Sequence, residues 1–193
     1  MKKKFKIALF ASGSGTNAEE IIKYFQHHAS IEVVLLLSNN PDAYALERAK
    51  KFNVPVHIFN RYDFREEKMF LPVLGNSHIT HIVLAGFLWL IPDYLVKAFP
   101  HHIINIHPAL LPKYGGKGMY GMKVHETVKT MLEKETGITI HEVNEKYDEG
   151  KILFQAKCSV EPADSPEQIA HKVHQLEYQH YAVVIENWIQ SNV

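Results

Sequence analysis

The 193-residue sequence has little cysteine, no excess of charge of one sign and no long apolar run. Its single cysteine, Cys158, excludes an internal disulfide and a cysteine zinc cluster, and is typical of a reducing compartment. Lysine plus arginine and aspartate plus glutamate each number 21, so no overall field draws the chain to nucleic acid. No apolar run is long enough to cross a bilayer. We therefore expect a cytoplasmic protein with neither nucleic acid nor a membrane as its partner.

The composition is that of a folded protein. Hydrophobic residues make up 46% and charged residues 22% of the sequence, which excludes an intrinsically disordered chain. A chain of this length suits one domain with elaborations, in which about 70% of the unfolded surface becomes buried. Because the sequence has no repeats or linker-like stretches, we expect a single domain over residues 1–193.

Apolar runs alternate with helical patterns through the first half of the sequence. The run Lys6–Ala11 closes at glycines, which is typical of a strand buried on both faces. This alternation predicts an α/β fold with an open, mostly parallel twisted sheet, Rossmann-like in its N-terminal half, with helices on both faces. Further strands are expected at residues 31–37, 56–58, 82–85 and 103–106, and helices at residues 42–51, 63–74 and after Pro92.

The C-terminal part of the sequence has a different pattern. Two strands, joined by the long loop 144–150, predict an antiparallel addition to the sheet. The last helix begins at Pro166, with Ser165 and Gln168 as a capping box. The elements expected are a helix at 122–133 and strands at 137–143 and 152–158. The apolar stripe of the last helix contains Ile169, Val173, Leu176 and then Val183 or Val184.

A glycine loop, Gly13-Ser14-Gly15-Thr16-Asn17, separates the first strand from the first helix. Glycines let backbone N–H groups approach an anion, and the N-terminus of the helix adds a favourable dipole. We expect a monophosphate site here, with Thr16 and Asn17 adding side-chain hydrogen bonds. We also expect Asn17 to cap the helix, with Glu20 as its capping-box partner.

Two other interpretations of the glycine loop stay open. It nearly matches the dinucleotide pattern G-x-G-x-x-[GA], but that pattern needs an acid after the second strand to hold the ribose hydroxyls. No acidic residue occurs there before Asp42, which favours the monophosphate. The remaining alternative is a tight turn that binds nothing.

Asn105 and His107 lie two residues apart at the end of an expected strand, so their side chains share one face. Ligand clefts of open α/β sheets lie at this end of the strands. A histidine exchanges protons near neutral pH and an asparagine amide donates to an oxyanion, which suits attack by an amine on an activated carbonyl. Asp148, in the loop 144–150, is expected to orient His107 and to raise its pKa.

The alternatives for these residues are structural. With 13 histidines in the chain, an arbitrary one lies on the surface or supports the fold. Asp148-Glu149-Gly150 is also a common turn composition. Spacing alone does not establish that the aspartate reaches the histidine.

The run from Asn105 to Tyr114 resembles the signature of the folate-dependent formyltransferases, and particularly of the members that act on glycinamide ribonucleotide. The resemblance continues through the glycine loop, Ala85-Gly86-Phe87 and Tyr147-Asp148-Glu149-Gly150, in order and with similar gaps over nearly the whole chain. It implies the formyltransferase fold, (6R)-10-formyltetrahydrofolate as co-substrate and no metal. The acceptor would be the amine of glycinamide ribonucleotide, in purine biosynthesis, and a homodimer stays open as the assembly.

The resemblance also implies roles for individual residues. His107 matches the catalytic histidine, Asn105 its partner and Asp148 the supporting aspartate, so that Asn105 and a protonated His107 would stabilise the oxyanion of a direct transfer. The ribonucleotide would contact Gly15, Thr16, Asn17, Arg65 and Glu177. The folate would contact Leu88, Trp89, Leu90, Ile91, Asn144, Glu145, Lys146, Tyr147 and Asp148.

The sequence departs from the family pattern at one of these residues and at one other position. Trp89 stands where many relatives carry arginine, and Thr139 where serine is frequent. Without the resemblance, residues 88–91 would be read as core, Glu177 as a solvated charge at the edge of a helix, and Arg65 as part of an ordinary charged surface.

Three other functions compete. Methionyl-tRNA formyltransferases share the signature but usually add a C-terminal domain and a basic surface, whereas this sequence ends after one helix and is neutral. Formyltetrahydrofolate deformylases typically add an N-terminal domain, whereas the first strand here begins at Lys6. A nucleotide-binding module without chemistry would not need Asn105, His107 and Asp148 together. We therefore expect the transferase.

Overall fold

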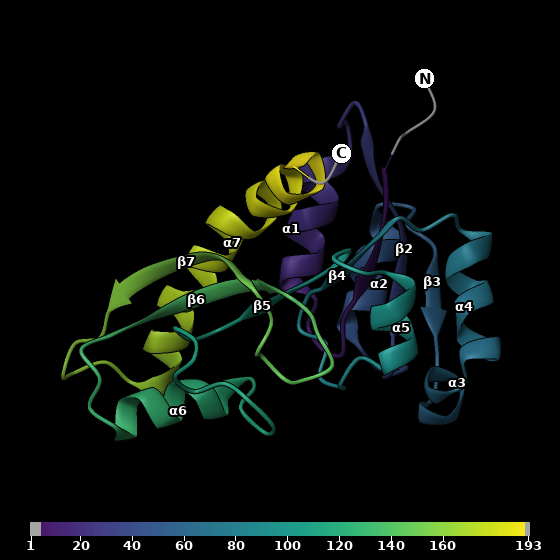
Figure 1. Ribbon diagram of the computed structural model, residues 1–193. Coiled ribbons are helices and arrows are strands. Elements are labelled where there is room, and N and C mark those ends of the chain that lie inside the picture. Colours follow the sequence, from purple (N-terminus) through teal and green to yellow (C-terminus); the bar gives the residue numbers. More distant parts are fainter. Residues whose placement is uncertain (1–4, 192–193) are drawn as a thin grey trace.

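The computed structural model describes residues 5–191 and contains one seven-stranded sheet (Figure 1). The strands lie in the order β3-β2-β1-β4-β5-β6-β7. Their bounds are β1 Phe5–Phe10, β2 Ile31–Ser38, β3 Val56–Ile58, β4 His81–Leu84, β5 Ile103–His107, β6 Glu135–Glu142 and β7 Ile152–Ser159. The helices are α1 Thr16–Phe25, α2 Tyr44–Lys51, α3 Arg61–Arg65, α4 Glu67–Asn76, α5 Asp93–Ala98, α6 Met122–Thr130 and α7 Pro166–Ser191.

The first five strands are parallel, and β6 and β7 are antiparallel to their neighbours. The predicted α/β architecture with an antiparallel addition is therefore confirmed. The chain runs from β1 outward through β2 to β3, then returns to the other side of β1 with β4. This reversal opens a crevice at the carboxyl ends of β1 and β4, where doubly wound sheets bind their ligands.

The two faces of the sheet carry separate cores because alternate side chains of a strand point to opposite faces. Ile7 and Leu9 of β1 pack in a cluster that includes side chains from α1, α2 and α7. Ala8 and Phe10 pack in a second cluster with side chains from α3, α4 and α5. Figure 1 shows α1 beside α7, and α4 and α5 on another side of the strands. Helices therefore cover both faces of the sheet, as predicted.

The helix predicted at residues 63–74 is wrong in one respect: the structure contains two helices, α3 and α4. Glu66 between them is extended, with φ −96° and ψ 103°, and ends the first helix. The Asn60 side chain accepts from Asp63 N and caps α3, so the helical segment also begins earlier than predicted. Local capping, rather than the apolar pattern, sets these boundaries.

Helix α7 begins as predicted: Gln168 N donates to Ser165 Oγ at 3.3 Å, and Ser165 N donates to Gln168 Oε1 at 2.8 Å. Its buried face follows the predicted stripe and also includes polar residues. Ile169 and Val173 are buried, and Leu176 and Val184 are half-buried and pack against the core, whereas Val183 is 42% exposed. Two residues with polar groups, Glu177 and Tyr181, lie on the buried face and were missed because the predicted stripe counted only hydrophobic residues. The buried residues spaced four apart on this face are Ile169, Val173, Glu177, Tyr181 and Ile185.

Helix α7 crosses the sheet beside the crevice. The Tyr181 hydroxyl is fully buried and donates to the Leu84 carbonyl of β4 at 2.8 Å. This contact fixes α7 against the middle of the sheet and directs Glu177, one turn earlier, toward the carboxyl ends of the strands. Among residues 5–191, no helix combines the length and the apolar character needed to span a membrane.

Candidate active site

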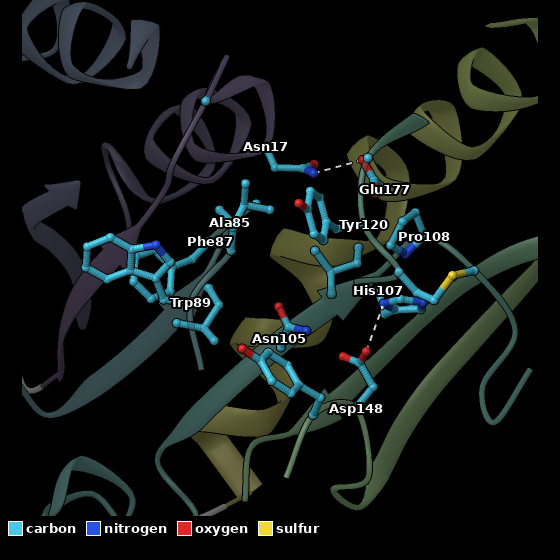
Figure 2. A pocket seen from close by; sticks show the side chains of 18 of the residues that line it. Asn17, Ala85, Phe87, Trp89, Asn105, His107, Pro108, Tyr120, Asp148 and Glu177 are labelled. Atoms are coloured by element: carbon cyan, nitrogen blue, oxygen red, sulfur yellow. Dashed lines mark hydrogen bonds and ion pairs between the residues drawn. The ribbon is translucent and has the colours of Figure 1, made fainter. Parts of the chain in front are cut away.

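A cavity of about 640 Å³ lies at the carboxyl ends of β1, β4 and β5. Figure 2 shows the side chains that converge on it from both halves of the sheet and from α7. The cavity joins the glycine loop to His107, so the histidine is not walled off from the expected phosphate site. The lining comprises residues 13–17, 84–91, 105–108, 116–122, 125, 141, 143, 146–148, 174 and 177.

The glycine loop turns into α1 through Gly15, which has a left-handed φ of 73° and is the N-cap residue. The prediction that Asn17 caps α1 is wrong, because the cap has no side-chain hydrogen bond. Asn17 Nδ2 instead donates to Glu177 Oε2 at 2.8 Å (Figure 2). Its expected partner Glu20 pairs with Lys23 on the surface of α1. The loop backbone is therefore exposed to the cavity without a competing side-chain cap.

Glu177 is 6% exposed and lies at the wall of the cavity that α7 provides. Burial raises the pKa of its carboxyl to about 7, although the hydrogen bond from Asn17 opposes this shift. A carboxylate with a pKa near neutrality, facing a ligand cavity, is typical of a functional site. The alternative of a solvated charge at the edge of a helix is excluded by this burial.

His107 is the last residue of β5 and is 4% exposed. Its Nε2 lies 2.8 Å from the Tyr114 carbonyl oxygen, and its Nδ1 lies 3.5 Å from Asp148 Oδ2. Because a carbonyl only accepts, Nε2 must carry the hydrogen of the neutral ring. Nδ1 is therefore the atom that gains or loses a proton, next to the Asp148 carboxylate.

Asp148 raises the pKa of His107, as predicted, but the net shift of this pKa is downward. Burial lowers this pKa by more than Asp148 and the Tyr114 carbonyl raise it. The nearby imidazole of His141 lowers it further. The histidine is therefore predominantly neutral at neutral pH and can accept a proton at Nδ1.

Asp148 reaches the histidine, as the sequence predicts. Its backbone has a φ of 55°, and the Gly116 N–H donates to Oδ2 at 2.9 Å. Burial would raise its pKa, but His141, His107 and the Gly116 N–H together bring it below the usual range. A charged carboxylate is thus fixed beside the histidine, where it stabilises any imidazolium that forms.

His141 is a further residue of the site that the sequence reasoning missed. It faces Asn105 across the β5–β6 pairing. Its Nδ1 donates to the Glu142 carbonyl at 2.8 Å, so its Nε2 can accept from Asn105 Nδ2 at 3.1 Å. This bond orients the Asn105 amide. Its place in the site depends on the register between β5 and β6, which could not be predicted from the sequence.

The segment after β4 forms a further wall of the cavity and is joined to the residue before the glycine loop, because Leu88 N donates to Ser12 Oγ at 3.1 Å. Leu88 and Leu90 are 43% and 38% exposed, whereas Ile91 is 1% exposed and belongs to the core. Trp89 is half-buried, and the guanidinium of Arg61 lies 4.7 Å from the centroid of its ring. All four of the predicted residues 88–91 line the cavity. The wall is apolar and suits a flat heterocycle.

The remaining expected ligand residues divide into two groups. Lys146, Tyr147 and Asp148 line the cavity. Asn144 and Glu145 lie outside the lining, and Asn144 Oδ1 accepts from Lys146 N at 2.9 Å, which shapes the turn. Arg65 ends α3 with an exposed side chain and also lies outside the lining. Among residues 5–191, no group of three or more His, Cys, Asp or Glu side chains is arranged to hold a metal ion.

Comparison with known proteins identifies the family. A model of the formyl transferase family matches residues 5–185. The chain is 40% identical over 186 residues to the chloroplastic phosphoribosylglycinamide formyltransferase of Arabidopsis thaliana, a match that covers 93% of this chain and 64% of that protein. It is 33% identical over 192 residues to phosphoribosylglycinamide formyltransferase of Bacillus subtilis, covering 97% of this chain and 96% of that protein.

The fold agrees with solved structures. The crystal structure of phosphoribosylglycinamide formyltransferase from Bacillus halodurans superposes with a TM-score of 0.87 at 32% identity, covering 97% of both chains. The chain spans less than two thirds of the length of the plant relatives: 64% of the Arabidopsis thaliana protein and 62% of the Vigna unguiculata protein. The family implied by the sequence motifs is confirmed, and the chain belongs to the formyl transferase family.

Proposed function

We propose that this chain transfers the formyl group of (6R)-10-formyltetrahydrofolate to the amine of glycinamide ribonucleotide, giving N-formylglycinamide ribonucleotide and tetrahydrofolate in purine biosynthesis. The proposal depends chiefly on one observation: Asn105, His107 and Asp148 meet in the same cavity as the glycine loop. The names of the bacterial and plant relatives, phosphoribosylglycinamide formyltransferase, support the acceptor and the transfer of a formyl group.

The cavity offers complementary surfaces for the two substrates. The ribonucleotide phosphate occupies the glycine loop, where backbone N–H groups and the N-terminus of α1 favour an anion. The Glu177 carboxylate accepts from the ribose hydroxyls. The pterin lies along residues 88–91 and the loop residues 146–148. Anchoring both substrates brings the amine to the formyl carbon and removes most of the entropic cost of their encounter.

The proposed chemistry is a direct transfer. The neutral amine attacks the formyl carbon, and the Asn105 amide donates to the resulting oxyanion. His107 Nδ1 accepts the proton that the amine nitrogen loses, and Asp148 stabilises the imidazolium. The bond between the formyl carbon and N10 of the folate then breaks, and His107 returns the proton to N10. The new N–C bond and the new N10–H bond complete the exchange.

The remaining expectations belong to the same proposal. Residues 1–193 form one formyltransferase domain, of which residues 1–4 and 192–193 lie outside the described part. The chain acts in the cytoplasm on small molecules, with neither nucleic acid nor a membrane as its partner. The equal numbers of acidic and basic residues and the single cysteine support these expectations.

The test is an incubation of the protein with 10-formyltetrahydrofolate, with and without glycinamide ribonucleotide, in which donor, tetrahydrofolate, formate and formylated ribonucleotide are all followed. We expect loss of the donor that depends on the ribonucleotide, with one formylated ribonucleotide per tetrahydrofolate. Formate released without the acceptor would instead indicate a hydrolase. Binding of both compounds without any turnover would indicate a module without chemistry.

A further inference from the structure

The glycine loop is fixed from behind by helix α2. Ala45 N donates to the Gly13 carbonyl at 3.1 Å, and Arg48 Nε donates to the Ser14 carbonyl at 2.9 Å. Gly15 packs so closely that a Cβ there would lie 2.4 Å from the Ala45 Cβ. Three successive residues of the loop are therefore held by one face of α2, where positions three apart are neighbours.

This attachment determines where the loop N–H groups point. In a trans peptide the N–H and the C=O of one unit point in opposite directions. Because the carbonyls of Gly13 and Ser14 face α2, the N–H groups of Ser14 and Gly15 face away from it. The Gly15 carbonyl accepts from Glu19 N at 2.9 Å, so the Thr16 N–H points outward from the start of α1. None of these three N–H groups donates to another residue within the stretch 5–191.

Arg48 also controls charge at the start of α1. Its guanidinium is in contact with the Glu19 carboxylate and lies 4.9 Å from the centroid of the Tyr44 ring. Glu19 belongs to the first turn of α1, and its side chain is 16% exposed. Glu19 also pairs with the more exposed Lys23 at 3.1 Å, and without Arg48 its incompletely neutralised carboxylate would repel a phosphate at the glycine loop. Arg48 therefore has two contacts that bear on an anion: one with the Ser14 carbonyl and one with Glu19.

We propose that Arg48 is a positioning residue for the phosphate of the acceptor. It holds the Ser14 carbonyl toward α2, directs the Gly15 N–H toward the cavity, and neutralises Glu19. The proposal rests on the proposed function, in which the ribonucleotide phosphate occupies the glycine loop. Arg48 itself does not line the cavity, so its effect passes through the loop backbone.

The test compares Arg48→Met with Lys50→Met in the full chain. Lys50 is the matched control because it lies on the same helix, pairs with Glu47 at 2.7 Å and does not contact the loop. We expect Arg48→Met to raise the KM for glycinamide ribonucleotide at least tenfold, with kcat and the KM for the folate donor within twofold. The inhibition constant of inorganic phosphate, competing with the ribonucleotide, should rise in parallel. Lys50→Met should change none of these values.

Two further variants separate the contributions and guard against loss of folding. Adding Glu19→Gln to Arg48→Met removes the carboxylate that Arg48 no longer neutralises and that only Lys23 still contacts, and we expect it to recover part but not all of the lost affinity. Arg48→Lys keeps the charge but cannot form both contacts at once, because its single ammonium replaces a planar group with several donors. It should give an intermediate KM even if Arg48→Met does not fold.

An unchanged KM for the ribonucleotide in a folded Arg48→Met protein would overturn the proposal. A parallel fall of kcat and of both affinities would also overturn it, since that result indicates general damage. The phosphate competition experiment distinguishes a failure of the Arg48 role from a failure of the phosphate site at the glycine loop. If phosphate competes with the ribonucleotide equally in both proteins, Arg48 has no such role while the phosphate site stands. If phosphate does not compete even in the unmodified protein, the phosphate assignment of the loop is itself wrong.

Discussion

Replacing Thr139 by valine should loosen the turn that follows His107. Thr139 lies in β6 opposite His107 and is fully buried. Its Oγ1 donates to the Ala109 carbonyl at 2.7 Å and accepts from Leu111 N at 2.9 Å and from Gln155 Nε2 at 2.9 Å. One hydroxyl thus satisfies two backbone groups of the segment that follows β5.

The magnitude follows from the groups left without partners. Valine keeps the shape but removes the hydroxyl, so the Ala109 carbonyl and the Leu111 N–H lose their hydrogen bonds in a buried site. Each such loss costs about 1–3 kcal/mol, which predicts a loss of about 2–6 kcal/mol in the free energy of unfolding. Thr139→Ser keeps the hydroxyl and loses one methyl group, for which we expect about 1 kcal/mol.

The assay is urea denaturation of both variants beside the unmodified protein, together with kcat in native buffer. We expect Thr139→Val to have a much lower unfolding midpoint than Thr139→Ser, and a lower kcat because the Tyr114 carbonyl that orients His107 lies on the loosened segment. If the two variants were equally stable, the hydroxyl would not support this turn.

Three other perturbations test separate parts of the site and fold. Asp148→Asn should lower kcat at least ~100-fold while the KM for the donor changes little, because the imidazolium of His107 loses its counter-charge; near-normal turnover in single-turnover mixing would contradict this. Since the pKa of Glu177 is raised to about 7, the KM for the ribonucleotide should rise as pH falls through neutrality, and Glu177→Gln should flatten that profile; a persisting pH dependence would assign it elsewhere. Burial, with a contribution from His102, lowers the pKa of His81 to about 4, so the unfolded state binds more protons between pH 6.5 and 4 and stability is lost as pH falls. Urea denaturation should show that this group lowers the free energy of unfolding by about 2 kcal/mol at pH 5, and that this loss is absent in His81→Phe. An identical dependence of unfolding free energy on pH in that variant would contradict the assignment.

The positions of β1, β2, β4 and β5 could be predicted because each is a short, mainly apolar run closed by glycine, proline or polar residues. Their order could not, since the place of β1 between β2 and β4 depends on pairings between distant segments. The break at Glu66 was missed because the helical pattern runs through it, and only the backbone angles mark the boundary.

The candidate site shows the same division. Asn105 and His107 could be brought together from their spacing on one strand, and the structure places both in the cavity. Asn17 was misassigned as a local cap because its partner, Glu177, lies 160 residues away. His141 and the Tyr114 carbonyl required the register of β6 and the path of the segment after β5. The sign of the pKa shift of His107 required its burial, which no sequence pattern gave.

The direct role of His107 in formyl transfer is tested most sharply by His107→Ala, compared with the unmodified protein under single-turnover conditions with both substrates saturating. Loss of the group that moves the proton should reduce the transfer rate by about 100- to 1000-fold, comparable to removal of one oxyanion donor. The affinity for glycinamide ribonucleotide should change less than about threefold, because the phosphate lies at the glycine loop. An unchanged transfer rate in a folded His107→Ala protein would contradict the account.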